Sequence, residues 1–271
     1  MVPDFSRLRR NVFAARRRML KMYYEAGSGH LGGSLSCLDA MMVLYHEIMT
    51  PRDRFILSKG HAAGALYVTL WSKGLLSDED LKSFSGEGTT LPGHPSGGGI
   101  PGLLFPTGSL GHGMPLASGL ALAARDKGDD FRVFCLCSDG EWQEGSCWEA
   151  LIFALHNHLD NLTVLVDQNG LQAFGTTEEV ASMSDLEVKL AAFGPSYASV
   201  DGHDLSAVHA ALASRERNTK GPHFIFLRTR KGRGTHFENS MASHYLPLTE
   251  AQYLDACAVL DAEEENSGEF R

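Results

Sequence analysis

Four acidic side chains crowd the stretch CSDGEWQEGSCWEA, residues 137–150, directly behind the apolar run FRVFCLC. Asp139 is the first of them, and Asn169 ends the next long apolar run, NLTVLVDQN. In open α/β sheets, ligands bind outside the carboxyl ends of the strands, so we expect Asp139 and Asn169 to meet at one sheet edge. A carboxylate, an amide oxygen and a backbone carbonyl would form a hard oxygen site, which suits Mg²⁺ together with phosphate and water oxygens. The alternative is a solvated turn before a helix.

The neighbours of Asp139 favour an anion beside such a metal. Gly140 allows the backbone to come close to a bound group. A helix is predicted to begin near Ser146, and its first N–H groups can point at an anion. This stretch therefore predicts a site for a metal ion and a phosphorylated molecule.

Histidines in glycine-rich turns form a second set of candidates. His30, His61 and His94 each follow a glycine, which is a poor position for a packing histidine, so we favour functional roles for them. The segment around His244 supports such a role less strongly. His156 and His158 suggest a metal pair, but residues two apart on a helix face different sides, so we interpret them as surface residues.

The elements that must position these residues alternate along the chain. Apolar residues at three- and four-residue spacing predict a helix over 6–24, and a second helical pattern runs through 36–49. A short strand, a turn at 58–61 and a helix are predicted within 53–74, followed by a long loop rich in Gly and Pro and a helix from about 114. Nearly continuous apolar runs predict buried strands at 131–138, 161–169 and 222–230, and helices lie between them at about 146–158 and 204–217. This alternation predicts an α/β fold, a doubly wound, mostly parallel sheet with helices on both faces.

The length of 271 residues suits one large α/β domain, and no linker or repeat divides the chain. We therefore expect a single domain over 1–271, with an N-terminal helix region over 1–20 and a charged, frayed tail over 262–271. The run of arginines at 16–18 is interpreted as a solvated helix face rather than a nucleic-acid patch.

Charge and composition exclude several classes of protein. The net charge of −9 argues against nucleic acid as the partner, because such proteins normally carry a basic face. No apolar run approaches the roughly 18–20 residues that span a bilayer, so we expect no membrane contact, and the N-terminus lacks the apolar core of a signal peptide. The five cysteines are odd in number and scattered, which favours reduced thiols in a cytoplasmic protein. Cys135 and Cys137 lie on one face of a strand, and packing is favoured over a redox or metal pair.

The two-part stretch SDGEWQEGSCWEA and LDNLTVLVDQNGLQ resembles the thiamin diphosphate motif, a strand–GDG–helix–strand–N unit. GHLGGSLS, LSKGHAAGALY, LPGHP, TGSLGHG and TTEEV are similar to segments of transketolases. The resemblance runs from about residue 20 to residue 250 and covers the N-terminal, diphosphate-binding part of that family. Among its members, the chain is most similar to the N-terminal subunit of split, two-chain transketolases.

The resemblance implies roles for particular residues. The Mg²⁺ ligands would be Asp139, Asn169 and the carbonyl of Leu171. The residues that contact thiamin diphosphate would be His61, Gly108, Ser109, Leu110, Asp139, Gly140, Glu141, Asn169 and Leu171. The substrate channel would be lined by His30, His94 and His244, of which His94 hydrogen-bonds the two-carbon unit and the other two act as acid and base. Glu144 would face the catalytic glutamate of a partner chain.

Three positions depart from the family pattern. Ser138 replaces the first Gly of GDG, which is acceptable where that residue has a negative φ. Leu31 replaces the proline usual after the first histidine, and Tyr245 replaces the glycine usual after the last one. The latter two lie beside substrate-channel positions, so they concern the sugar more than the cofactor.

The implied activity is transfer of a two-carbon glycolyl unit from a ketose, or ketose phosphate, to an aldose or related acceptor. The cofactor performs the carbanion chemistry, and the family activates it with a glutamate from a separate pyrimidine-binding domain. Motifs use this chain to about residue 250, and some twenty further residues are too few for that domain. We therefore expect the partner to be a C-terminal, pyrimidine-binding transketolase subunit, in an α₂β₂ complex.

Two other functions compete with this one. The chain could be the α-type subunit of a thiamin-dependent 2-oxoacid dehydrogenase or of a deoxyxylulose-phosphate-type synthase, in which case the complex would release CO₂ from pyruvate. It could also be a non-catalytic relative, in which case it would not bind thiamin diphosphate with Mg²⁺.

Overall fold

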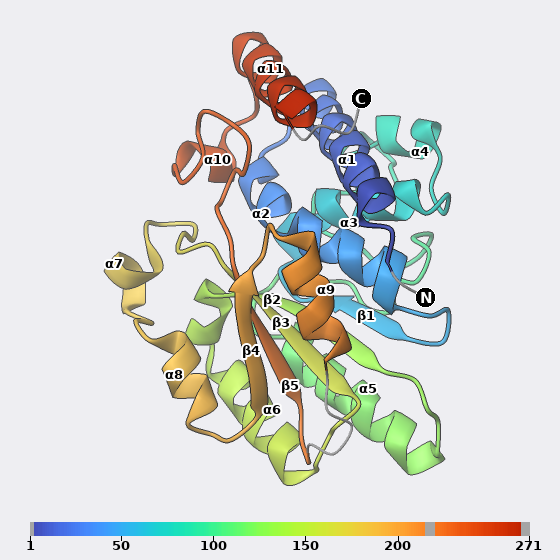
Figure 1. Ribbon diagram of the computed structural model, residues 1–271, viewed down its shortest axis with the longest axis vertical. Coiled ribbons are helices and arrows are strands. Elements are labelled where there is room, and N and C mark those ends of the chain that lie inside the picture. The colour runs from blue at the N-terminus through green and yellow to red at the C-terminus, as the bar shows by residue number, and fades with distance from the viewer. Residues whose placement is uncertain (1–2, 215–219, 267–271) are drawn as a thin grey trace.

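Five parallel strands form the centre of the molecule in a computed structural model that describes residues 3–214 and 220–266. The strands are β1 (Arg54–Leu57), β2 (Val133–Ser138), β3 (Leu162–Gln168), β4 (Ser196–Asp201) and β5 (His223–Arg228). Their order in the sheet is β1-β2-β3-β5-β4 (Figure 1), and every neighbouring pair is parallel. The expected α/β sheet with parallel strands is confirmed.

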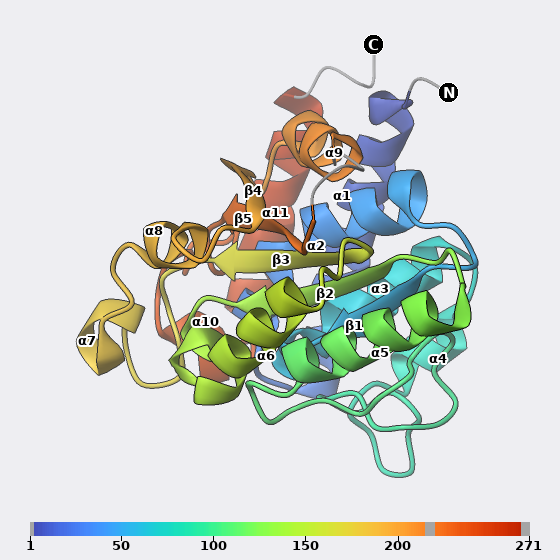
Figure 2. The ribbon, with the colours of Figure 1, turned by 90° about the horizontal axis from the view of Figure 1, so that it is seen from below.

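Helices cover both faces of the sheet (Figure 2). On one side pack the long N-terminal helix and its neighbours, α1 (Phe5–Ala26), α2 (Leu31–Val43), α3 (Ala63–Ser72) and α9 (Leu205–Ala213). On the other side pack α5 (Gly113–Lys127), α6 (Gly145–His156) and α8 (Leu186–Ala191). Short or peripheral elements complete the described chain: a π-helix (Leu44–Ile48), two 3₁₀ helices (Gly60–Ala62 and Gly140–Gln143), α4 (Asp78–Lys82), α7 (Thr177–Ala181), α10 (Ala242–Tyr245) and α11 (Glu250–Asn266).

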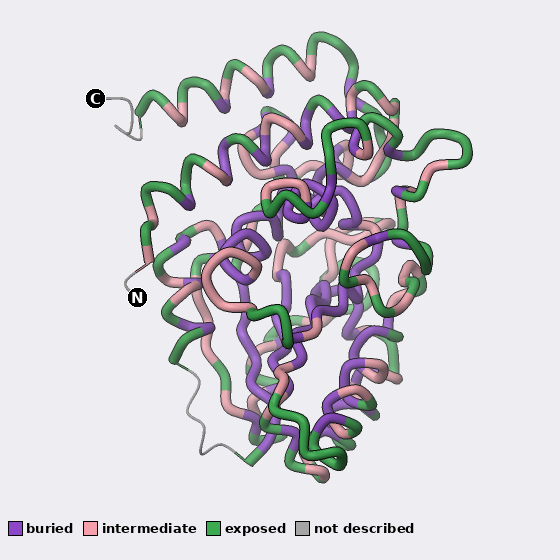
Figure 3. The backbone as a smooth tube through the Cα atoms, turned by 90° about the vertical axis from the view of Figure 1, so that its right-hand side faces the viewer, coloured by how far each residue is buried: buried purple, intermediate pink, exposed green. Residues whose placement is uncertain are grey.

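Alternation along the strands divides the apolar interior into two clusters. Phe134 and Leu136 of β2 face the cluster with α1, α2 and α3, whereas Val133, Cys135 and Cys137 face the cluster with α5 and α6. All six residues of β2 are buried, and Figure 3 shows the strands as the buried centre of the molecule. Burial on both faces explains why the strand sequences read as continuous apolar runs. Cys135 and Cys137 pack together inside one cluster, and all five cysteines are free thiols.

The structure adds elements that the sequence pattern did not indicate. β4 is an edge strand with partly exposed residues, and its sequence, SYASVD, has no apolar run. α11 packs against α1 and continues to Asn266. Residues 262–266, expected to be frayed, are therefore helical, and residues 267–271 lie outside the described part of the chain. Within residues 3–214 and 220–266, no helix is both long and apolar enough to cross a bilayer.

Candidate active site

The carboxyl ends of β2 and β3 bring Asp139 and Asn169 to the same sheet edge, because Ser138 and Asp167 are register partners. The backbone N–H of Asp139 donates to the carbonyl of Asp167 at 3.1 Å. Ser138 is not among the described non-glycine residues with positive φ, so its replacement of glycine leaves this turn unstrained. Asp139 itself is 6% exposed.

A small hairpin carries the other two oxygen donors. Leu171 pairs with Thr176, and the N–H of Gln172 donates to the carbonyl of Gly175 at 2.9 Å. Gly170 has φ of 74°, a left-handed conformation that favours glycine, and its N–H donates to Oδ2 of Asp139 at 2.6 Å. The hairpin is thus tied to Asp139 at its base, next to Asn169 and Leu171.

Burial leaves the Asp139 carboxylate poorly stabilised. Desolvation, with a further contribution from Asp167, raises its pKa to about 6, although the N–H groups of Gly140 and Gly170 act in the other direction. Gly140 donates to Oδ1 at 2.8 Å, so each carboxylate oxygen keeps a lone pair for another partner. A bound cation would relieve this cost.

Four histidines converge over this edge in a cavity of about 410 Å³. The ring centroid of His30 lies 6.0 Å from that of His61, 5.3 Å from His94 and 5.0 Å from His244. The cavity wall also includes Gly108, Leu110, Asp139, Gly140, Glu144, Asn169, Leu171 and Tyr245. Residues from several segments, far apart in the sequence, therefore share one space.

The backbone holds His30 in an unusual conformation. His30 precedes α2 with φ of 71°, in the left-handed region that non-glycine residues rarely adopt. Its N–H donates to the carbonyl of His244 at 2.8 Å. A Cβ on Gly29 would lie 2.4 Å from the carbonyl oxygen of Tyr245, so only glycine allows this approach. The segment that contains His244 and Tyr245 thus fixes the His30 ring in the cavity.

The surroundings keep these imidazoles neutral. Desolvation is the main cause that lowers the pKa of each of the four, and it lowers the pKa of His244 to about 3 with help from Lys231 and His30. Nδ1 of His244 is buried without a hydrogen-bond partner in the described structure. A neutral imidazole has one nitrogen that accepts a proton and one that donates, so the cavity offers both functions at neutral pH.

Two of the expected cofactor residues do not line the cavity. Ser109 is exposed, whereas its neighbours Gly108 and Leu110 contribute to the wall. Glu141 is fully buried beneath it, where its carboxylate accepts hydrogen bonds from Ser58 Oγ, from the N–H of Gly111 at 2.8 Å and from the N–H of Ser138 at 3.2 Å. The structure therefore assigns Glu141 to the support of the cavity, because it ties three segments together from below.

Buried lysines are the site residues that the sequence analysis missed. Lys59 and Asp167 are fully buried and form an ion pair, and Lys59 Nζ also donates to the carbonyl of Gly33 at 2.9 Å. Although desolvation alone opposes both charges, the pairing raises the pKa of Lys59 and lowers that of Asp167. Asp167 accepts from Nδ2 of Asn169 at 3.1 Å, which turns Oδ1 of that amide away from Asp167.

Lys231 is a second cation at this edge. It is 1% exposed, lines the cavity and donates from Nζ to the carbonyl of Leu171 at 2.9 Å. Desolvation, and then the charge of Lys59, lowers its pKa to about 8. The segment KGRG after the strand at 222–230 was the available signal for it, because a lysine just past a parallel strand lies at the ligand-binding edge.

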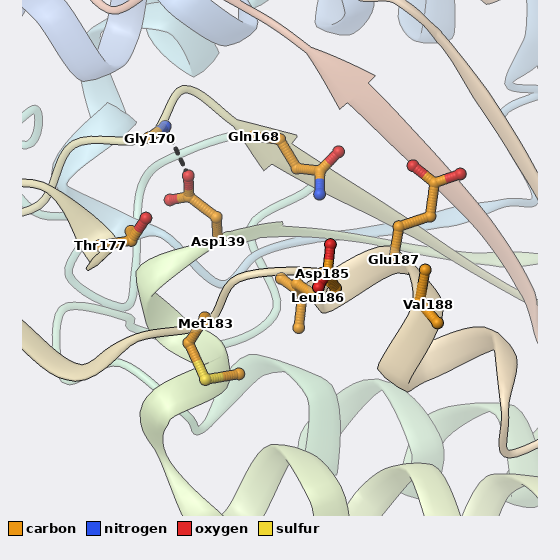
Figure 4. Close-up of a pocket in the computed structure, with 9 residues that line it drawn as sticks. All are labelled: Asp139, Gln168, Gly170, Thr177, Met183, Asp185, Leu186, Glu187 and Val188. Carbon is orange, nitrogen blue, oxygen red and sulfur yellow. Dashed lines mark hydrogen bonds between the residues drawn. The ribbon is translucent and has the colours of Figure 1, made fainter.

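A second hollow of about 410 Å³ adjoins Asp139 from the side of α7 and α8 (Figure 4). Its wall includes the side chains of Met183, Leu186 and Val188, together with Asp185 and Glu187. Figure 4 also shows the hydrogen bond that joins Asp139 to Gly170. The histidines lie in the other cavity, so the groups that can move protons converge on one side of Asp139 only.

Comparisons with known proteins agree with this geometry. The family described as transketolase, thiamine diphosphate binding domain, matches residues 9–264. One of the two subunits of an apulose-4-phosphate transketolase, from Phocaeicola vulgatus, is 37% identical over 269 residues, which are 93% of this chain and 95% of that protein. The 6-deoxy-6-sulfo-D-fructose transketolase subunit SqwG from a Clostridium species is 37% identical, over 92% of this chain and 94% of that protein.

A solved structure extends the likeness to three dimensions. Transketolase from Leishmania mexicana matches with a TM-score of 0.88 and 28% identity, over 94% of this chain and 41% of that one. The match thus spans nearly all of this chain but less than half of that transketolase chain. The chain belongs to the transketolase family and corresponds to its N-terminal, thiamine diphosphate-binding part.

Proposed function

We propose that this chain is the N-terminal subunit of a transketolase that transfers a two-carbon glycolyl unit from a ketose or ketose phosphate to an aldose or related acceptor. In this proposal it is a transferase of aldehyde or ketone groups that depends on thiamin diphosphate and Mg²⁺. The relatives named above are transketolases of different sugars, so the proposal names the class of substrate and no single sugar. Free thiols at all five cysteines support a cytoplasmic location as part of the same proposal.

One observation carries the proposal. A cavity with four neutral histidines on one wall has an oxygen cluster, formed by Asp139, Asn169 and Leu171, on its floor. The first group suits proton transfer to and from hydroxyl and carbonyl oxygens, and the second suits a hard cation beside a diphosphate. Transfer of a carbon unit between sugars needs both.

The donor set fits Mg²⁺ bound together with a phosphorylated ligand. Asp139 supplies a carboxylate, Asn169 an amide oxygen and Leu171 a carbonyl oxygen. Among the described residues, no three His, Cys, Asp or Glu side chains gather as a metal site, so the ligand's oxygens must complete the shell. Nε2 of Gln172, also in the cavity wall, is buried without a partner and can donate to such a ligand.

The charges nearby favour a diphosphate. Lys231 lines the cavity as a buried cation, and Gly140 presents backbone that carries no side chain at its wall. When bound, thiamin diphosphate supplies the nucleophilic carbon that carries the two-carbon unit. We assign His61, Gly108 and Leu110 to its contacts, and Glu141 to the loop beneath them.

The remaining histidines handle substrate protons. His94 is exposed at the mouth and would hydrogen-bond the hydroxyls of the two-carbon unit. His30 and His244, held together by the 2.8 Å backbone hydrogen bond, would take and return the proton of the acceptor oxygen. Glu144, exposed on the cavity wall, would face the partner's catalytic glutamate.

A partner chain is part of the proposal. The relatives that match over at least 94% of their own length are named as subunits. We infer that a C-terminal, pyrimidine-binding transketolase subunit supplies the missing glutamate, in an α₂β₂ complex.

The test is glycolyl transfer with Mg²⁺ and thiamin diphosphate, measured for the purified chain alone and after addition of the candidate partner. We expect turnover only from the pair. Robust turnover by the lone chain would reject the split-subunit proposal. Release of CO₂ from pyruvate by the pair would instead favour the 2-oxoacid or deoxyxylulose-phosphate class, and absence of Mg²⁺-dependent thiamin diphosphate binding would favour a non-catalytic relative.

A further inference from the structure

His203 lies in the turn between β4 and α9, outside the cavity, and its side chain is 8% exposed. Nδ1 of the ring is 2.8 Å from Oδ2 of Asp39 in α2. Nε2 is 3.0 Å from the backbone nitrogen of Arg230, just beyond β5. The ring therefore bridges two elements that are distant in the sequence.

The two partners determine the tautomer of His203. A backbone N–H can only donate, so Nε2 must be the acceptor for Arg230 and carries no proton. Nδ1 then carries the proton and donates to Asp39. Asp39 is suited to receive it: burial alone would raise its pKa, but Arg16 and the hydrogen bond from His203 hold the pKa below its usual value. The ring is thus a neutral connector with a fixed direction.

The backbone that His203 holds leads directly to the cavity. Arg230 is the residue before Lys231, whose Nζ reaches the carbonyl of Leu171. Gly232, on the other side of Lys231, donates its N–H to the carbonyl of Gly32 at 3.0 Å. Lys231 is therefore suspended between two anchors, one at His203 and one at α2.

The turn around His203 is built to lie against this segment. A Cβ on Gly202 would come within 2.5 Å of Thr229 Cγ2 and 3.1 Å of Leu227 Cβ. The N–H of Gly202 donates to the carbonyl of Arg228 at 2.9 Å. Glycine at this position allows the close approach, and it delivers the His203 ring to the N–H of Arg230.

We propose that His203 is a positioning residue for the cofactor: by accepting the N–H of Arg230, it aims Lys231 at the diphosphate side of the cavity. The inference rests on the proposed binding of thiamin diphosphate with Mg²⁺. The contact that matters is the one from Nε2, and the contact to Asp39 serves to keep the ring in the required tautomer.

Two conservative substitutions separate these contacts. The amide of His203→Asn lies where Nδ1 lies and can still donate to Asp39, but it does not reach Arg230. The amide of His203→Gln reaches the position of Nε2 and can accept from Arg230. We expect His203→Asn to weaken Mg²⁺-dependent thiamin diphosphate binding about 10-fold, the low end for loss of an outer-shell partner, and His203→Gln to stay near the wild type.

Calorimetric titration of the intact chain with thiamin diphosphate at saturating Mg²⁺ gives the dissociation constants, and thermal melts report folding. Lys231→Met provides the second arm. If His203 acts through Lys231, His203→Asn should cause no further loss of affinity in the Lys231→Met background, because the two residues form one pathway. His209→Asn, a histidine of α9 that packs on Phe5, is the matched control and should bind normally.

The outcomes are distinct. Wild-type affinity in His203→Asn, equal losses in the Asn and Gln variants, or a full additional loss in the Lys231→Met background would each overturn the positioning role. If the Asn variant does not fold, the comparison of His203→Gln in the presence and absence of Lys231→Met still tests the pathway, because an additive loss would reject it. A wild-type chain that does not bind thiamin diphosphate with Mg²⁺ would reject the proposed function itself.

Discussion

Asp139 is a buried carboxylate whose hydrogen-bond donors in the structure are the N–H groups of Gly140 and Gly170. We predict that Asp139→Ala abolishes Mg²⁺-dependent thiamin diphosphate binding and leaves the domain folded, because the charge that holds the cation is removed. Calorimetry and a thermal melt measure both effects. Asp185→Ala, in the hollow on the other side of Asp139, is the control and should bind as the wild type does. Wild-type affinity in Asp139→Ala would show that the metal site is assigned to the wrong residue.

The pH dependence of metal binding should follow the same carboxyl group. Desolvation raises its pKa to about 6, so below that pH the empty site holds a proton that Mg²⁺ must displace. We predict that Mg²⁺ affinity increases as pH rises from about 5 to about 7 and then becomes constant. The cavity histidines do not contribute this step, because their pKa values are lowered by burial. Titrations at several pH values measure it, and a flat profile across that range would contradict it.

His94 should affect turnover but not cofactor binding. It lies at the open side of the cavity, 5.3 Å from His30 between ring centroids. We predict that His94→Ala lowers turnover of the reconstituted complex by about 10²-fold or more, the low end for lost acid–base help. The cofactor dissociation constant should be unchanged. Ketose cleavage at the wild-type rate would remove His94 from the mechanism.

Sequence reasoning reached those site residues that stand in recognisable turns and missed those defined by contact. Asp139 and His61 follow strands and glycines, so their positions could be predicted. Lys59 and Asp167 read as ordinary residues, and only the folded sheet brings their side chains together. Glu141 illustrates the converse: the motif placed it near the cofactor, but its hydrogen bonds with Ser58 and Gly111 turn its carboxylate inward.

At the scale of elements, α5 shows how close packing sets the position of the cavity loop. A Cβ on Gly113 would lie 2.1 Å from Ser58 Oγ, whereas one on Gly119 of the same helix would meet nothing within 4 Å. We predict that Gly113→Ala destabilises the protein by about 1–3 kcal/mol through overpacking, and that Gly119→Ala stabilises it by about 0.5–1 kcal/mol. Urea denaturation of both variants measures the difference, and equal effects would contradict this packing argument.

The elements predicted correctly are those whose sequence must be apolar throughout. β2, β3 and β5 are buried on both faces, so each reads as one apolar run. β4 lies at the sheet edge with a partly exposed side, and SYASVD carries no such signal. α11 buries only Ala256 and Leu260, which is too little apolar periodicity to predict its extent.

At the scale of the whole molecule, apolar side chains are exposed around the cavity. Phe174, at the hairpin next to the oxygen donors, is 85% exposed, and Leu246 is 60% exposed. Burial of one such side chain contributes roughly 2–3 kcal/mol, so this surface favours association. We predict that the isolated chain self-associates and that Phe174→Ser reduces this, whereas Leu75→Ser, an exposed apolar residue outside the cavity wall, does not. Sedimentation velocity measures it, and a monomeric wild type at micromolar concentration would contradict it.

The sheet order has a consequence for how this chain folds. β1 pairs with β2 although all of residues 58–132 lie between them, and β3 pairs with β5 across β4. Each pairing closes a long loop before any hydrogen bond of the ladder can form, and this entropic cost slows the search. Local helices such as α1 can form within microseconds, whereas the oxygen cluster at the ends of β2 and β3 must wait for the long-range pairings. The competence to bind a metal should therefore be among the last properties to emerge during refolding.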